Sequence, residues 1–254
     1  MLVLHNISKY YNKGTNNEIC LFHEFQLHMK QGEFMSVVGS NGSGKTSLLN
    51  IICGSTPIDS GKISIQGKDI TRMPEHKRHK MLGRVYQDPT MGTCPHMTIL
   101  ENMSLADNKG KPFNLRLGTK KSRKEYYQEQ LKVLGLGLEN KMDTKVGVLS
   151  GGQRQAMALL MATLTPIDFL ILDEHTAALD PKTAQIIMEL TDKVVREKKL
   201  TTIMVTHNLR YALEYGDRLI MMQQGKVMMD KRGEEKKSIQ VDDILLKLNE
   251  ISIG

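Results

Sequence analysis

The stretch Gly39-Ser40-Asn41-Gly42-Ser43-Gly44-Lys45-Thr46 has the spacing G-x-x-x-x-G-K-T. Its glycines allow the backbone to curl, so that successive N–H groups face inward and can surround phosphate oxygens. The Lys45 ammonium can then reach the outer phosphates, and the Thr46 hydroxyl can be a ligand of Mg²⁺. The segment Phe34–Val38, which reads as a buried strand, precedes the stretch, and a helical pattern follows it to about Cys53. We therefore predict a phosphate-binding loop between a buried strand and a helix.

Apolar or β-branched runs alternate with helical patterns along the chain, which is typical of an α/β fold with a mostly parallel sheet. Two antiparallel elements are expected as well. One lies in the N-terminal part and turns at Gly67, and the other is a closing hairpin that turns at Gly225. The other expected strands are 82–87, Phe169–Asp173 and 201–206, and the expected helices are 153–164 and 181–198. The ranges around Gly67 are 63–66 and 69–71, and those around Gly225 are 218–222 and 227–229.

The region from about 88 to 147 breaks this alternation. Its clearest element is an amphipathic helical pattern over residues 122–134. We expect an inserted helical subdomain here.

Composition excludes several classes of protein. The 254 residues are 40% hydrophobic and 25% charged, which is typical of a globular chain. The longest unbroken apolar stretch, 156–162, is far shorter than the roughly 20 residues of a membrane-spanning helix. No signal-peptide pattern is present, and Cys20, Cys53 and Cys94 show no C-x-x-C spacing, so we expect a reducing, cytoplasmic location without structural zinc.

A pair of acids follows the apolar run 169–172. Because ligands bind at the carboxyl ends of strands in open α/β sheets, Asp173 and Glu174 are expected beside the phosphate-binding loop. Asp173 is placed to hold Mg²⁺ through water, and Glu174 to orient and deprotonate an attacking water molecule.

Leu149-Ser150-Gly151-Gly152-Gln153 is the third motif. Ser150 and Gln153 have the spacing of a capping box, so a helix is expected to begin here with exposed N–H groups and a positive dipole end. The two glycines carry no side chains and would let a phosphate approach the backbone.

Together these motifs resemble those of the ATP-binding subunit, or nucleotide-binding domain, of ABC transporters, over about residues 2–245. The resemblance implies one ABC ATPase domain over 1–254 with a P-loop NTPase core. Residues 1–87 and 162–254 form the α/β core, and 88–161 form the helical subdomain that carries the signature motif.

The resemblance also implies ATP and Mg²⁺ as cofactors and a set of site residues. Glu174, His207 and Gln87 are the expected catalytic residues, and Thr46, Gln87 and Asp173 the expected metal residues. His207 lies in Val205-Thr206-His207-Asn208, and Asp180 in Ala178-Leu179-Asp180 resembles the D-loop. The expected nucleotide contacts are Tyr11 (with Tyr10 as its rival for stacking on adenine), Gly39, Ser40, Asn41, Gly42, Ser43, Gly44, Lys45, Thr46, Ser47, Ser150, Gly151, Gly152, Gln153 and Asp180.

Two positions depart from the family pattern. His175 stands where most members have Pro, and Ala177 where Ser is commoner. With Gly14-Thr15 and Met91-Gly92-Thr93, the segment 173–180 looks like one importer branch, whose members are often assigned aromatic amino acids or related small solutes.

The resemblance implies partners as well. Two copies would pack head to tail, with each ATP between the Lys45 loop of one copy and Ser150–Gly152 of the other. Integral membrane permease subunits would dock at 88–97, and a separate substrate-binding protein would deliver the solute, with no nucleic acid involved. The chain would then lie at the cytoplasmic face of the cell membrane.

Other interpretations remain open from the sequence. They are an exporter subunit, a soluble ABC ATPase acting on ribosomes or nucleic acid, and a non-ABC P-loop kinase. The last leaves Leu149–Gln153 without a purpose. The sequence also leaves open whether the second ATPase subunit is a copy of this chain or a paralogue.

Overall fold

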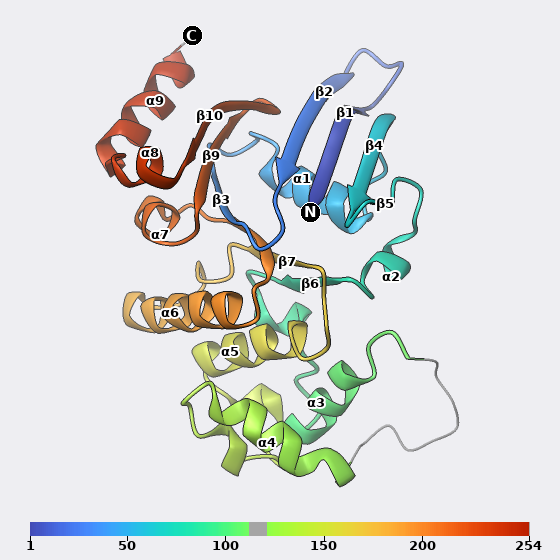
Figure 1. Cartoon of the computed structure of the whole chain (residues 1–254), viewed down its shortest axis with the longest axis vertical. Helices are drawn as coiled ribbons and strands as arrows, with labels where there is room; N and C mark the ends of the chain where they lie inside the picture. Colours follow the sequence, from blue (N-terminus) through green and yellow to red (C-terminus); the bar gives the residue numbers. More distant parts are fainter. Residues whose placement is uncertain (112–120, 254) are drawn as a thin grey trace.

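The computed structural model describes residues 1–111 and 121–253 and contains two sheets (Figure 1). The larger is six-stranded, in the order β10-β9-β3-β8-β7-β6. All neighbouring pairs in it are parallel except β9 and β10. Its strands are β3 (Phe34–Val38), β6 (Leu82–Val85), β7 (Phe169–Asp173), β8 (Thr201–Val205), β9 (Arg218–Gln223) and β10 (Lys226–Arg232). The predicted α/β fold with a mostly parallel sheet is therefore confirmed.

The smaller sheet is antiparallel and has the order β2-β1-β4-β5. Its strands are β1 (Leu2–Tyr11), β2 (Ile19–Met29), β4 (Ser60–Ile65) and β5 (Lys68–Asp69). The predicted turn at Gly67 is present, but its second strand is 68–69 rather than 69–71. We did not predict β1 or β2 from the sequence. Their register shifts at several bulges, and the resulting loss of strict alternation hides the strand pattern.

The middle of the large sheet is buried on both faces, which explains its continuous apolar runs. Ile171 of β7 belongs to one core, with the antiparallel sheet and α1 (Lys45–Cys53). Leu170 and Leu172 belong to the other core, with α5 (Gly151–Ala162) and α6 (Pro181–Glu197). The helix after the phosphate-binding loop thus packs between the two sheets.

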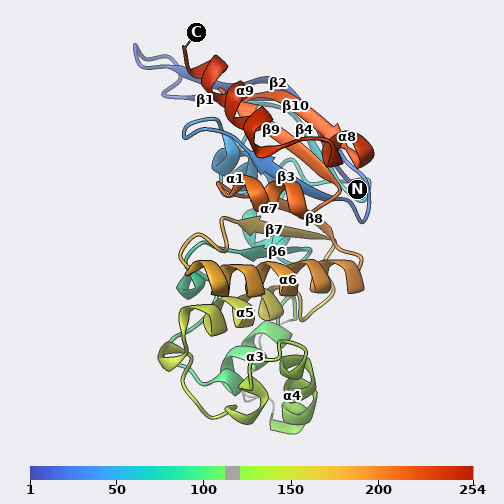
Figure 2. The same ribbon diagram turned by 90° about the vertical axis from the view of Figure 1, so that its left-hand side faces the viewer.

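The helices α3 (Ile99–Asp107) and α4 (Lys124–Lys132) lie beyond α5 and α6, on the side that faces away from the large sheet (Figure 2). The helix predicted over 122–134 is shorter, because a 3₁₀ turn at Lys121–Arg123 precedes it. The helix predicted from 153 begins two residues earlier, at Gly151, directly after its capping residue Ser150.

The strand predicted to end at Gln87 ends at Val85, so Gln87 lies in a bend beyond β6. The remaining helices are α2 (Glu75–Arg78), α7 (Leu209–Glu214), α8 (Gly233–Lys237) and α9 (Val241–Ile253), with 3₁₀ turns at Pro89–Met91, Leu138–Asn140 and Val146–Val148. Within the described residues, no helix is both long enough and apolar enough to cross a membrane.

Candidate functional site

The phosphate-binding loop follows β3 and leads into α1, as the sequence predicts. Lys45 is only 5% exposed, and its Nζ donates to the carbonyl oxygens of Gly39 at 2.7 Å and Ser40 at 2.9 Å. Gly39 must be glycine, because a Cβ there would lie 2.2 Å from the carbonyl oxygen of Met222. Burial lowers the pKa of Lys45, and the nearby Glu174 carboxylate opposes that shift. The loop therefore curls around its own lysine.

A pocket of about 260 Å³ opens at this loop. Its lining includes the whole segment from Asn41 to Ser47, together with Tyr11, Glu174 and His207. Gly39 and Ser40 are not among its lining residues. The fold thus gathers side chains from β1, the loop and the ends of β7 and β8.

Glu174 and His207 form the polar wall of this pocket. His207 Nε2 lies 2.8 Å from Glu174 Oε1, and the two side chains are 47% and 16% exposed. Glu174 has φ of 48°, a left-handed conformation that is rare outside glycine and often found at functional sites. Its backbone N–H donates to the carbonyl of Val205 at 2.9 Å, which ties the turn after β7 to the end of β8.

Tyr11 and its rival Tyr10 point to different surroundings. Tyr11 lines the pocket, and its hydroxyl lies 3.4 Å from Ser47 Oγ. Tyr10 instead lines a separate pocket that includes Lys13 and Asp59. This placement favours Tyr11 as the stacking residue.

The expected metal residues lie around the strand end. Thr46 is exposed at the start of α1, Asp173 is the last residue of β7, and Gln87 is exposed beyond β6. Among the described residues, no group of three or more His, Cys, Asp or Glu side chains forms a metal site by itself. Mg²⁺ prefers oxygen ligands and is usually held by one or two carboxylates together with substrate phosphates. The oxygen donors of Thr46, Asp173 and Gln87 fit that ligand chemistry.

The signature segment Ser150–Gln153 is not part of the pocket lining. Ser150 Oγ accepts from the N–H of Gln153, and Gln153 Oε1 accepts from the N–H of Ser150, so the capping box is complete. A Cβ on Gly152 would lie 2.3 Å from Thr183 Cγ2 at the start of α6. This glycine therefore has a packing reason within the chain, in addition to the predicted phosphate approach.

Asp180 also has a structural task. It is the N-cap of α6, and its Oδ1 accepts from the N–H of Thr183 at 3.1 Å. The hydrogen bonds from Thr183 hold the pKa of the Asp180 carboxyl below its usual value. Asp180 is not among the residues that line the pocket.

Three contacts at the site were missed from the sequence. Ser40 Oγ hydrogen-bonds Gln223 Oε1, and the N–H of Gly225 donates to the Ser43 carbonyl at 3.0 Å, so the β9–β10 hairpin supports the loop. Arg84 on β6 forms an ion pair with Asp173. The available signal was a charged residue inside an otherwise apolar strand.

His175, the departure from the family pattern, is fully buried. Thr191 Oγ1 donates to the carbonyl of Ile187 at 2.7 Å, so His175 Nε2, 3.1 Å away, donates to Thr191 Oγ1. Burial lowers the pKa of His175 to about 4, which makes it neutral at pH 7. The turn after Glu174 is thus fastened to α6 by a neutral imidazole. Ala177, the other departure, is exposed.

Comparison with known proteins agrees with these motifs. Residues 22–177 match the ABC transporter family. The chain is 48% identical over 249 residues to the tyrosine transport ATP-binding protein of Clostridioides difficile, covering 97% of this chain and 98% of that protein. It is 33% identical over 231 residues, 91% of this chain, to the spermidine/putrescine import ATP-binding protein PotA of Haemophilus influenzae, and spans only 57% of that relative. The solved dimeric ATP-binding cassette MJ0796, bound to ADP and Pi, superposes with a TM-score of 0.76 at 30% identity, covering 91% of this chain and 98% of that one.

Proposed function

Since this chain belongs to the ABC transporter family and is an ATP-hydrolysing subunit of a transporter, we propose that two copies enclose two ATP molecules and power the import of a small solute. The observation that carries the proposal is the pocket that unites the Lys45 loop with Glu174 and His207, while Ser150–Gln153 lies outside its lining.

The proposal assigns roles to the loop, to Glu174 and His207 in the pocket, and to Asp173 and Gln87, which are not among its lining residues. The backbone N–H groups of 41–46 and the Lys45 ammonium bind the phosphates. Glu174 accepts a proton from the attacking water, and His207 orients the Glu174 carboxylate at 2.8 Å. Thr46, Asp173 and Gln87 hold Mg²⁺, which neutralises charge on the phosphate oxygens when bound.

The signature segment serves a second copy. The positive N-terminal end of α5 would face the phosphates held by the other copy's loop, in the role of a trans-acting cation. The solved relative MJ0796 is a dimer bound to ADP and Pi, and this supports such a pairing.

The membrane partner completes the proposal. Permease subunits dock at 88–97, where Met91 is 68% exposed. They hold the chain at the cytoplasmic face of the membrane and receive solute from a separate substrate-binding protein. We propose an aromatic amino acid as the solute, because the relative from C. difficile is named for tyrosine transport. No nucleic acid takes part.

The dimer is tested with Glu174→Gln, which should bind ATP without hydrolysing it. In size-exclusion chromatography with light scattering, ATP should double the mass from 28.7 kDa, and turnover should fall by about 10²-fold or more. Ser150→Glu in the same background should bind ATP with unchanged affinity yet stay monomeric. A Glu174→Gln chain with near-normal turnover would contradict the general-base role, and a dimer that survives Ser150→Glu would contradict the trans arrangement.

The direction of transport is tested with the membrane partner. The tagged Glu174→Gln chain is used with ATP to isolate a multispan protein from detergent extracts. Wild-type chain and that protein are then reconstituted in vesicles with labelled tyrosine. ATP-dependent movement toward the ATPase side supports import, and movement away from it supports an exporter.

A further inference from the structure

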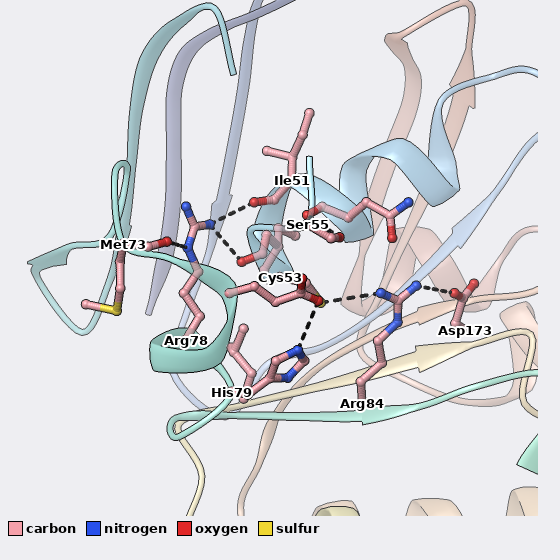
Figure 3. A network of polar contacts seen from close by, with 12 residues as sticks. Ile51, Cys53, Ser55, Met73, Arg78, His79, Arg84 and Asp173 are labelled. Atoms are coloured by element: carbon pink, nitrogen blue, oxygen red, sulfur yellow. Dashed lines mark hydrogen bonds and ion pairs between the residues drawn. The ribbon is translucent and has the colours of Figure 1, made fainter. Parts of the chain in front are cut away.

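The carboxylate of Asp173, one of the expected metal residues, is paired with a buried positive charge. Arg84 Nη2 lies 2.7 Å from Asp173 Oδ2, and the two side chains are 9% and 15% exposed (Figure 3). They come from neighbouring parallel strands, β6 and β7, and Asp173 immediately precedes the pocket residue Glu174. An arginine is always protonated, so the pair has no net charge when Asp173 is ionised.

The other neighbours of Arg84 do not neutralise it. Nη1 lies 3.7 Å from Cys53 Sγ, and burial raises the pKa of that thiol to about 11, so it is uncharged at pH 7. The Tyr86 ring lies 4.7 Å from the guanidinium carbon. Arg84 Nε has no hydrogen-bond partner among the residues that the structure describes. Of these neighbours, Asp173 is therefore the one whose charge can offset the positive charge of Arg84.

This pairing changes the charge next to the pocket, although neither side chain is among the pocket's lining residues. An ionised Asp173 without a counter-charge would repel the anionic phosphates and attract a cation, and both interactions are strong near a partly buried site. Arg84 weakens both, because it binds one carboxylate oxygen and cancels the charge.

We propose that Arg84 is a positioning residue that neutralises Asp173 and thereby lowers the dependence of nucleotide binding on Mg²⁺. The inference rests on the proposed nucleotide and metal roles of the pocket. It concerns a side chain that those roles do not include.

The test compares the Kd for ADP, measured by calorimetry, in EDTA and in excess Mg²⁺. In Arg84→Met, the Kd in EDTA should rise roughly tenfold while the Kd in Mg²⁺ stays equal or falls, since only the positive charge is lost. Arg84→Lys keeps the charge and should leave the ratio of the two Kd values within about threefold of wild type. Adding Asp173→Asn to Arg84→Met removes the uncompensated acid and should restore binding in EDTA.

The inference is overturned if Arg84→Met weakens ADP binding equally in EDTA and in Mg²⁺. It is also overturned if Arg84→Met unfolds at the wild-type temperature and the ratio of the two Kd values is unchanged. If Arg84→Met does not fold, the same comparison is made with Arg84→Gln and with the double variant Arg84→Met/Asp173→Asn. The double variant leaves no unpaired charge.

The single variant Asp173→Asn separates this inference from the proposed function. It should bind ADP more tightly in EDTA and lose most of the benefit of Mg²⁺. If Asp173→Asn keeps the wild-type response to Mg²⁺, the metal role of Asp173 is wrong. If it behaves as expected and Arg84→Met does not, only the role of Arg84 is wrong.

Discussion

At the residue scale, adjacent side chains at the end of β1 have different surroundings. Tyr11 lines the pocket beside Ser47, and Tyr10 lies over another pocket with Lys13. Side chains alternate between the two faces of a strand, so only one of two neighbours can face the loop. The sequence could not say which, since the register of β1 depends on its bulges.

The neighbouring tyrosines provide a matched pair of variants. Tyr11→Ala should raise the Kd for ATP roughly tenfold, because stacking of a base on an aromatic ring contributes about 1–3 kcal/mol. Tyr10→Ala should leave that Kd unchanged, and Tyr11→Phe should keep most of the affinity. Calorimetric titration with ATP in the Glu174→Gln background measures all three. A loss of affinity in Tyr10→Ala alone would reverse the assignment.

The buried His175 should make the free energy of unfolding of the chain depend on pH. Its pKa is about 4 in the folded chain, against 6.5 for an ordinary histidine. Above pH 6.5 both states are neutral and His175 has no effect. As pH falls from 6.5 to 4, the unfolded chain takes up a proton that the folded chain does not, so the free energy of unfolding falls by about 3 kcal/mol.

The measurement is urea unfolding at several pH values for wild type and His175→Gln. Gln can still donate to Thr191 but does not titrate, so the variant should lose less stability between pH 6.5 and 4. Identical pH profiles would show that His175 is not neutral when buried.

At the element scale, the starts of α5 and α6 lie against each other. A Cβ on Gly152 would meet Thr183 Cγ2 at 2.3 Å, whereas a Cβ on Gly151 would meet Leu179 Cδ2 at 3.4 Å. The capping box could be predicted from the sequence, since Ser150 and Gln153 are three residues apart. The contact with α6 could not, because Thr183 is far along the chain.

Two alanine variants separate packing from helix propensity. Gly152→Ala should lower the free energy of unfolding by about 1–3 kcal/mol through overpacking. Gly151→Ala should be neutral or gain up to about 1 kcal/mol, since alanine favours the helix. Thr183→Ser removes the obstructing methyl and should restore Gly152→Ala. Chemical unfolding measures each variant, and an unrescued Gly152→Ala would place the strain elsewhere.

At the scale of the whole molecule, we propose that the permease contacts surface side chains of the helical subdomain. Met91 lies in the 3₁₀ turn just after the Gln87 bend and is 68% exposed. Motion of the subdomain would reach the membrane partner through this segment. Met91 is not among the residues that line the pocket, so coupling and catalysis can be separated.

Met91→Glu should reduce ATP-driven solute uptake in reconstituted vesicles roughly tenfold or more, because a carboxylate without a partner is costly to bury in an interface. The basal ATPase rate of the free chain should stay the same. Met228→Glu is the matched control, since Met228 is 46% exposed on β10. Normal uptake with Met91→Glu would move the docking site away from 88–97.

Features that depend on consecutive residues could be predicted from the sequence. The glycine spacing of 39–46 predicts the phosphate-binding loop, the run before Asp173 predicts a buried strand, and Ser150 with Gln153 predicts a helix start. Each follows from local backbone hydrogen bonding or from burial of a short segment. For the same reason, the parallel α/β fold could be predicted from alternating patterns.

Contacts between residues that are far apart in the sequence depend instead on the three-dimensional fold. Strand order brings His207 to Glu174 and Arg84 to Asp173, and bulges set the register that turns Tyr11 toward the loop. The packing of α5 on α6 and the support of the loop by the β9–β10 hairpin arise in the same way. These contacts depend on how whole elements are arranged, and no spacing along the chain encodes that arrangement.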